Sequence, residues 1–203
     1  MQARSRETRR RLVRAALRLW SERGFETGIE ETTAEEIAQA AGVTKGTFYF
    51  HFAHKEEILL EMGYETAAVL SEEAARCIKA NKPLEESLRI LMNALARNIK
   101  AADPAAVIRA LAEFRRPRRA DSEIPPLEPA FAGAFETLFA RAQKDGEVTA
   151  QVEPAEMAQI VEALVLDSIL EWAEGRTGRL NQALHRRTAI VLAGLHPDGT
   201  LSL

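Results

Sequence analysis

Residues 32–59 read TTAEEIAQAAGVTKGTFYFHFAHKEEIL, and this stretch decides the fold. Thr33 and Glu36 have the spacing of a capping box, which predicts that a helix begins at Thr33. Gly42 is placed to end that helix, and Thr44 can cap a second helix from Lys45 to about residue 50. Two short helices joined by a tight glycine turn are typical of a helix-turn-helix.

The first turn of the second short helix, Thr44-Lys45-Gly46-Thr47, suits a polyanion. The free amides and the dipole of a helix N-terminus favour phosphate, and Gly46 lets the backbone come close. Lys45 suits a guanine edge, and Phe50 or a threonine methyl suits a thymine methyl. We expect Thr44, Lys45, Thr47 and Phe50 to face bases, and the neighbouring Phe48 and Phe52 to be core residues.

The whole stretch resembles the DNA-binding signature of the tetracycline-repressor (TetR) family. The matching elements are Ile-Ala-x-x-Ala-Gly-Val, the glycine that follows, and Tyr-x-His-Phe-x-x-Lys. The resemblance implies that Tyr49 and Lys55 contact DNA phosphates and that Thr33 lies at the interface. Two alternatives remain. Tyr49 could instead be a buried tyrosine with a local partner, and His51 could either contact a phosphate or only pack and cap.

The resemblance also implies an all-α fold with two domains. A three-helix DNA-binding head would cover residues 1–55, and a helical ligand-binding and dimerisation domain would cover 56–203. The function it implies is a cytoplasmic repressor released from a palindromic double-stranded DNA operator by a small apolar or amphipathic molecule. The alternative is a helical ligand-binding or interaction protein that no longer binds DNA.

One segment departs from the family pattern. Between Gly24-Phe25 and Thr32-Thr33 the family usually has about two residues, whereas this chain has six, ETGIEE. We expect the extra residues to lengthen an acidic loop between the first two helices.

The rest of the chain reads as helices, because no stretch alternates β-branched residues between turn signals. A first helix is expected at 5–23, and a long helix is expected to start near Lys55 and to join head and body without a linker. Prolines at first-turn positions help to place later helices. The later helices are expected at 83–101, 104–117, 127–144, 154–174 and 180–195, with loops at 118–126 and 144–153.

The composition narrows the class of protein. The net charge of −3 hides a basic start, since residues 1–55 carry ten Lys and Arg against seven Asp and Glu. A basic head on an acidic body suggests a polyanionic partner, although a solvated arginine face is the simpler interpretation. The chain has a single cysteine, so we expect no intrachain disulfide framework. It has no apolar stretch long enough for a membrane helix. No catalytic motif, cofactor motif or metal-ligand set is present, so we expect no enzyme, no cofactor and no metal.

Two features of the body suggest partners. The segments 154–174 and 180–195 are apolar on nearly every side, which predicts a homodimer through the last two helices. The family places an effector cavity among the central helices, and Gly133 would leave space there. The residues expected to line it are Met92, Leu95, Phe114, Phe131, Phe135 and Trp172. Arginines near 109–119 read as a solvated surface or as an anion site.

Overall fold

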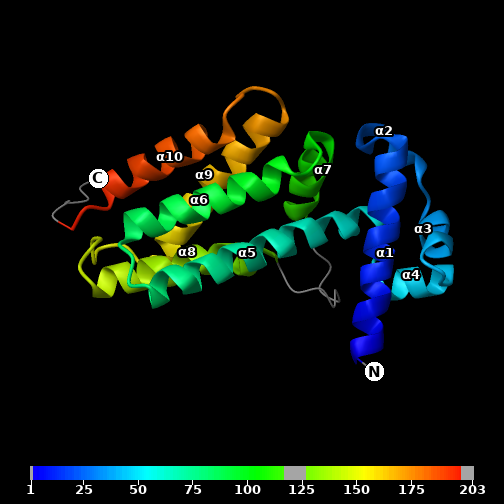
Figure 1. Ribbon diagram of the computed structural model, residues 1–203, viewed down its shortest axis with the longest axis horizontal. Helices are drawn as coiled ribbons and strands as arrows, with labels where there is room; N and C mark the ends of the chain where they lie inside the picture. Colours follow the sequence, from blue (N-terminus) through cyan, green and yellow to red (C-terminus); the bar gives the residue numbers. More distant parts are fainter. Residues whose placement is uncertain (1, 117–126, 198–203) are drawn as a thin grey trace.

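The computed structural model describes residues 2–116 and 127–197, and every regular element in these ranges is a helix (Figure 1). The predicted all-α fold is confirmed. The head contains α1 (Gln2–Arg23), α2 (Phe25–Glu31), α3 (Ala34–Ala40), α4 (Lys45–His51) and the 3-10 helix η1 (Lys55–Leu59). The body contains α5 (Leu60–Lys79), α6 (Leu84–Lys100), α7 (Pro104–Phe114), α8 (Leu127–Lys144), α9 (Pro154–Ala173) and α10 (Leu180–Gly194).

The head has a small core of its own. Trp20 and Leu12 of α1 are fully buried, as are Ile37 of α3 and Phe48 of α4. This core extends to Ile58 and Leu59 of η1, whereas Leu60 belongs to the core of the body. The two hydrophobic cores therefore divide at the start of α5, which runs from the head into the body without a linker (Figure 1).

The predicted helix-turn-helix is present, with its local signals satisfied. Thr33 caps α3, and both hydrogen bonds of the capping box with Glu36 form. Gly42 has a φ of 68°, a left-handed conformation that favours glycine, and the amide of Val43 donates to the carbonyl of Ala38 across the turn. The hydroxyl of Thr44 accepts from the amide of Thr47 and caps α4.

The segment expected to lengthen a loop is instead a helix, α2, so that expectation is wrong. Gly28 and Ile29 are buried, with Ile29 fully inside the core of the head. A β-carbon at Gly28 would lie 2.8 Å from the carbonyl oxygen of Trp20, so glycine permits this close approach. Tertiary packing of one buried isoleucine and one glycine therefore turns an acidic, loop-like hexapeptide into a seven-residue helix.

The body is a bundle in which α8 packs against both α5 and α9, and α10 packs against α6 and α9. The helices after α5 lie within three residues of their expected bounds, and residues 145–153 form the expected loop. The long helix expected to start near Lys55 begins instead at Leu60, because residues 55–59 form the 3-10 helix η1. The loop predicted at 118–126 lies outside the described residues. None of the described helices is long and apolar enough to span a membrane.

Candidate functional site

The four aromatic rings of residues 48–52 divide between the core and the surface. Phe48 and Phe52 are buried, as predicted, whereas Tyr49 is 52% exposed and Phe50 is 67% exposed. Phe48 meets the ring of Tyr49 edge-on, with the centroids 5.3 Å apart. The core therefore supports an outward-facing aromatic pair, and Tyr49 is not the buried tyrosine of the alternative interpretation.

The first turn of α4 presents small and polar groups to the solvent. Thr44, Lys45 and Gly46 are exposed, and the hydroxyls of Thr44 and Thr47 lie 2.9 Å apart. The ammonium of Lys45 lies 3.3 Å from a carboxylate oxygen of Glu35 on α3. Because both side chains of that ion pair are more than half exposed, the pair is weak and Lys45 can exchange it for another acceptor.

Thr33 and His51 stand at the two ends of the helix-turn-helix. Thr33 is exposed, and its hydroxyl and amide are both occupied by the capping box with Glu36. His51 is half-buried at the last position of α4, where its ring lies edge-on to Phe50 with the centroids 5.1 Å apart. Both residues therefore help to hold the helix-turn-helix in shape.

Lys55 has a structural role that its sequence context did not reveal. Its ammonium donates to the carbonyl oxygens of Glu30, at 2.7 Å, and Thr32, at 2.8 Å, and its side chain is only 18% exposed. These carbonyls lie at the C-terminus of α2, where the helix dipole favours a cation. The sequence could not predict this contact because α2 itself was not foreseen.

Arg9 is a further residue that the sequence did not single out. It donates to the carboxylate of Glu61 at 2.5 and 2.9 Å and to the backbone carbonyl of His51 at 2.9 Å. Its guanidinium also lies 4.2 Å from the centroid of the Phe52 ring. One arginine thus fixes α1 to the end of α4 and to the start of α5.

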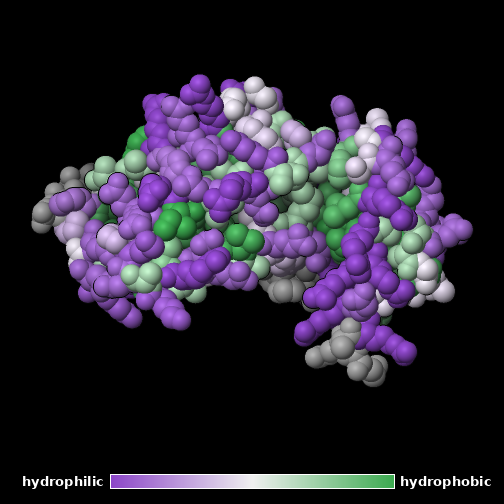
Figure 2. All heavy atoms as spheres, viewed as in Figure 1, coloured by the Kyte–Doolittle hydropathy of each residue, from purple (hydrophilic) through white to green (hydrophobic). Residues whose placement is uncertain are grey.

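A largely apolar cavity of about 360 Å³ lies where the head meets the body. Its wall includes Leu17 and Phe25 from the head and Leu60, Ala106 and residues of several other body helices. A hydrophobic patch is visible at this junction in Figure 2, beside the hydrophilic surface of α1. The cavity therefore belongs to neither core and is shared between the two parts of the molecule.

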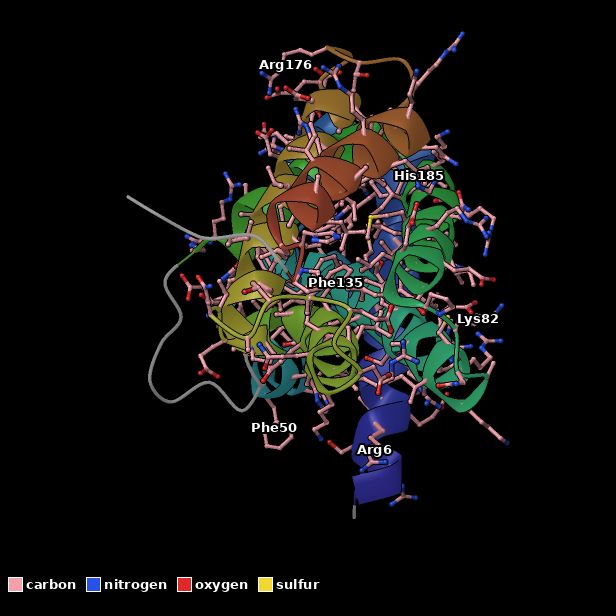
Figure 3. The ribbon with its side chains drawn as sticks, turned by 90° about the vertical axis from the view of Figure 1, so that its left-hand side faces the viewer. Arg6, Phe50, Lys82, Phe135, Arg176 and His185 are labelled. Carbon is pink, nitrogen blue, oxygen red and sulfur yellow. The ribbon has the colours of Figure 1, made fainter. Side chains whose placement is uncertain are left out.

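Two of the six predicted lining residues, Phe114 and Phe131, lie in the wall of this cavity. The other four, Met92, Leu95, Phe135 and Trp172, do not. The first three are fully buried in the body, and Figure 3 shows Phe135 inside the bundle, whereas Trp172 packs against the edge of the core. Gly133 does not line the cavity either. Apolar character and helical spacing predict burial, but they do not tell a packed side chain from one that faces a void.

The polar groups in the wall are few. Asn98 donates to the hydroxyl of Thr66 at 2.7 Å, and that hydroxyl donates to the carbonyl of Met62. Glu65 and Asp103 are the charged residues of the wall, which contains no lysine or arginine among the described residues. The cavity therefore suits an apolar, uncharged group better than a carboxylate.

Helix α7 joins the cavity to the head. Ala106, Ala110 and Phe114 line the cavity from one side of α7. Arg109 of the same helix forms an ion pair with Glu30 of α2, and Glu113 lies 3.2 Å from the imidazole of His54. A shift of the cavity wall would thus act directly on two segments of the head.

The predicted arginine cluster does not gather into one site. Arg109 pairs with Glu30, and Arg116 contacts Glu113 and His54. Arg115 is exposed, and Arg118 and Arg119 lie outside the described residues. Arg109 and Arg116 therefore form ion pairs within the chain.

The outer surfaces of α9 and α10 carry exposed apolar side chains. Ile160 is 42% exposed and Ile190 is 63% exposed. Ala163 and Ala193 are exposed three residues after them, and Ala189, the neighbour of Ile190, is exposed as well. Much of the apolar excess predicted for these helices is buried within the chain, but this stripe is not covered.

The exposed helix-turn-helix of the head, joined to a helical body, is the architecture of a DNA-binding transcriptional regulator. Residues 12–62 match the family described as bacterial regulatory proteins, tetR family. Residues 92–197 match the C-terminal domain of SbtR-like transcriptional regulators. The chain belongs to the TetR family, which is a family of transcriptional regulators and not of enzymes.

Curated relatives are similar mainly in the head. AcrR of Shigella flexneri is 43% identical over 56 residues, which cover 28% of this chain and 24% of that protein. The first four curated relatives are matched over 17% to 40% of their own length. The repressor BepR of Brucella suis is 25% identical over 178 residues, covering 85% of this chain and 83% of that protein.

Among solved structures, a TetR-family repressor from Thermus thermophilus, FadR in complex with lauroyl-CoA, is similar along the whole chain. The TM-score is 0.79 at 27% identity, and the alignment covers 96% of this chain and 98% of that one.

Proposed function

We propose that the protein is a transcriptional repressor that leaves its operator when an amphipathic molecule occupies the cavity between head and body. The observation that carries the proposal is the position of this cavity. Leu17, Phe25 and Leu59 of the head form part of its wall, so a molecule that fills the cavity contacts the head. We expect the protein to act in the cytoplasm, where its DNA lies.

The DNA contacts are proposed from the exposed side of α4. Thr44, Lys45, Thr47 and Phe50 are assigned to base edges, because their side chains can enter a major groove beside the N-terminus of the helix. Tyr49 is assigned to a phosphate through its hydroxyl.

The other residues predicted to contact DNA lie around this exposed side of α4. The backbone of Gly46 can approach a phosphate, and Thr33 and His51 flank the same surface. Lys55 has one ammonium hydrogen left for a phosphate, since two of its three donors serve Glu30 and Thr32.

We propose a homodimer through α9 and α10. The exposed Ile160 and Ile190, with small alanines beside them, form a stripe that a second copy of the same stripe can cover. Two heads related by a twofold axis then predict a nearly palindromic operator, with half-sites about one helical turn, roughly 10 base pairs, apart or a multiple of it.

The effector is proposed to be a long-chain acyl-CoA thioester. Thermus thermophilus FadR is similar along the whole chain and was solved with lauroyl-CoA. The wall of the present cavity supports the same class, since it is apolar and its charged groups are two carboxylates, which repel a free fatty acid but not the uncharged acyl chain and thioester. The anionic coenzyme would remain outside the wall.

Release is proposed to pass through α7 to α2. An acyl chain between α7 and Phe25 would separate them, which strains the Arg109–Glu30 ion pair. Glu30 also offers its carbonyl to Lys55 at the end of the helix-turn-helix, so α2 connects the cavity wall to the DNA-binding surface. The continuous α5 provides a second connection. A hundredfold release needs about 2.7 kcal/mol of coupling between the two sites.

A DNA mobility-shift titration tests the proposal. Duplexes would first be selected by the protein from a random-sequence library, and the winner titrated with excess nonspecific competitor. We expect a specific complex that lauroyl-CoA dissociates and that free coenzyme A does not. If the protein selects no sequence but still binds lauroyl-CoA, the alternative of a helical ligand-binding protein replaces the repressor.

A further inference from the structure

The part of the head that follows α1, residues 25–59, contains the helix-turn-helix and is acidic. Residues 25–59 contain two lysines and seven glutamates. Both lysines are engaged within the head, Lys45 with Glu35 and Lys55 with the end of α2. Sequence-independent affinity for DNA depends on cations that neutralise phosphates. Residues 25–59 by themselves therefore lack the positive charge that the proposed DNA partner requires.

The missing charge is concentrated in α1. Residues 1–24 contain eight arginines and two glutamates. The first buried residue of α1 is Leu12, so about ten residues of the helix precede the core. At 1.5 Å per residue, this part of α1 is about 15 Å long. Figure 1 shows it extending past the other helices of the head, and Figure 2 shows its surface as strongly hydrophilic.

Three arginines of this projecting part have no partner among the described residues, namely Arg4, Arg6 and Arg10, and all three are exposed. Other arginines of α1 are already used. Arg9 is held by Glu61, and Arg14 and Arg18 pair with Glu7 and Glu22. Three unpaired like charges within two helical turns repel one another, and this repulsion is relieved when an anion approaches.

The projecting part of α1 faces the same way as the DNA-reading helix. In Figure 3 Arg6 and Phe50 both lie toward the lower edge of the molecule, and in Figure 1 α4 lies beside the lower half of α1, from which the N-terminal turns project. A duplex that α4 enters would therefore continue toward Arg4, Arg6 and Arg10. Duplex DNA offers one negative charge per about 1.7 Å of axis, so phosphates are available along that whole path.

We propose that Arg4, Arg6 and Arg10 form a phosphate-binding extension of the DNA interface, which contacts the duplex beside the bases read by α4. This division of labour gives α4 the sequence preference and α1 most of the electrostatic affinity. The inference rests on the proposed DNA-binding function, and it adds a binding surface outside the helix-turn-helix.

The salt dependence of binding tests this surface. The dissociation constant for a mixed-sequence duplex of about 40 base pairs, long enough for one dimer, would be measured by fluorescence anisotropy over a series of salt concentrations. Each phosphate contact contributes about 0.9 to the slope of log K against log salt. For Arg4, Arg6 and Arg10 all changed to Gln, we expect the slope to fall by roughly 2.7 per protomer.

Two further variants make the test specific. Changing Arg76, Arg97 and Arg176 to Gln removes the same charge from exposed positions of the body and is expected to leave the slope unchanged. Changing Arg4, Arg6 and Arg10 to Lys keeps the charge and is expected to restore the slope. A wild-type slope in the Gln variant, or an equal fall in the body variant, overturns the proposal. Failure of the DNA-binding function itself is seen separately, as a wild type that binds no duplex or selects none.

Discussion

The outer surface of the head, formed by α4 and the start of α1, differs in construction from the inner surface that rests on the body. The outer surface projects from a closed core, with helix caps satisfied and Phe48 holding the exposed Tyr49 from beneath. The inner surface covers a cavity of about 360 Å³ and contacts α7 through the Arg109–Glu30 ion pair and the contact of His54 with Glu113. A head of this kind can move relative to the body while its DNA-binding surface keeps its shape.

The largest expected effect comes from disrupting the proposed dimer, which holds two outer surfaces in position for the two half-sites of an operator. Changing both Ile160 and Ile190 to Glu places charges on the uncovered stripe of α9 and α10, and we expect monomers. Operator affinity should fall by roughly 10³-fold or more, to the level of nonspecific binding, because two half-sites can no longer be held together. Sedimentation velocity and the mobility shift measure the two effects.

The matched control for this variant changes Ala68 and Ala75 on exposed positions of α5 to Glu, with the same change in charge. It should remain dimeric. A double variant at Ile160 and Ile190 that still sediments as a dimer would place the interface elsewhere.

The next effect distinguishes base recognition from phosphate binding within the outer surface. Changing Lys45 to Ala should weaken operator binding by roughly 1–3 kcal/mol and relax the preference at one base pair. Changing Tyr49 to Phe should weaken binding to every duplex alike, since a phosphate carries no base information. Binding measured across single-base operator variants distinguishes these patterns. Equal profiles for both variants would remove the assignment of Lys45 to a base.

Filling the cavity is expected to change ligand binding at the inner surface without changing the DNA-binding outer surface. Changing Ala106 to Leu adds bulk to the cavity wall, so lauroyl-CoA should no longer raise the melting temperature or release DNA. DNA affinity without ligand should stay close to that of the wild type. Gly133 changed to Leu is the control, because the added side chain meets open space and Gly133 does not line the cavity. Loss of ligand binding in the control alone would place the effector elsewhere.

The smallest effect concerns the N-terminal cap of α3, the helix that packs against α4. Hydrogen bonds from Arg23 and from the backbone and hydroxyl of Thr33 lower the pKa of Glu36 from 4.5 to about 2. Since this pKa is depressed in the folded state, the stabilisation is present above about pH 4.5 and is lost as the pH falls toward 2. Changing Glu36 to Gln should therefore flatten the acid side of the stability curve, measured by urea unfolding from pH 6 downward. An unchanged acid slope would contradict the capping role.

The helix-turn-helix could be predicted because its signals are local. A threonine, a glutamate three residues later and a left-handed glycine set α3, the turn and α4 without help from the rest of the chain. Helix α2 could not be predicted, because it depends on Gly28 meeting the backbone of Trp20. The role of Lys55 depends in turn on α2, so it was missed for the same reason.

The cavity escaped prediction for a different reason. Phe131 and Phe135 lie four residues apart on one helix, yet the first faces the cavity and the second is packed in the bundle. Sequence spacing placed both on the buried side of α8, which was correct. Which buried side chains surround a void depends on how neighbouring helices are placed, and here residues of α7 and Phe25 of α2 line the void.

The most direct test of the account is the mutual effect of operator and lauroyl-CoA on the same dimer. Isothermal titration would measure lauroyl-CoA binding with and without a saturating, selected operator duplex, and anisotropy would measure operator binding with and without saturating lauroyl-CoA. Linkage requires the two factors to be equal, and we predict that each ligand weakens the other by the same factor, on the order of a hundredfold. Binding of lauroyl-CoA with the same affinity in both states would show that the cavity does not control the head, and would contradict the account.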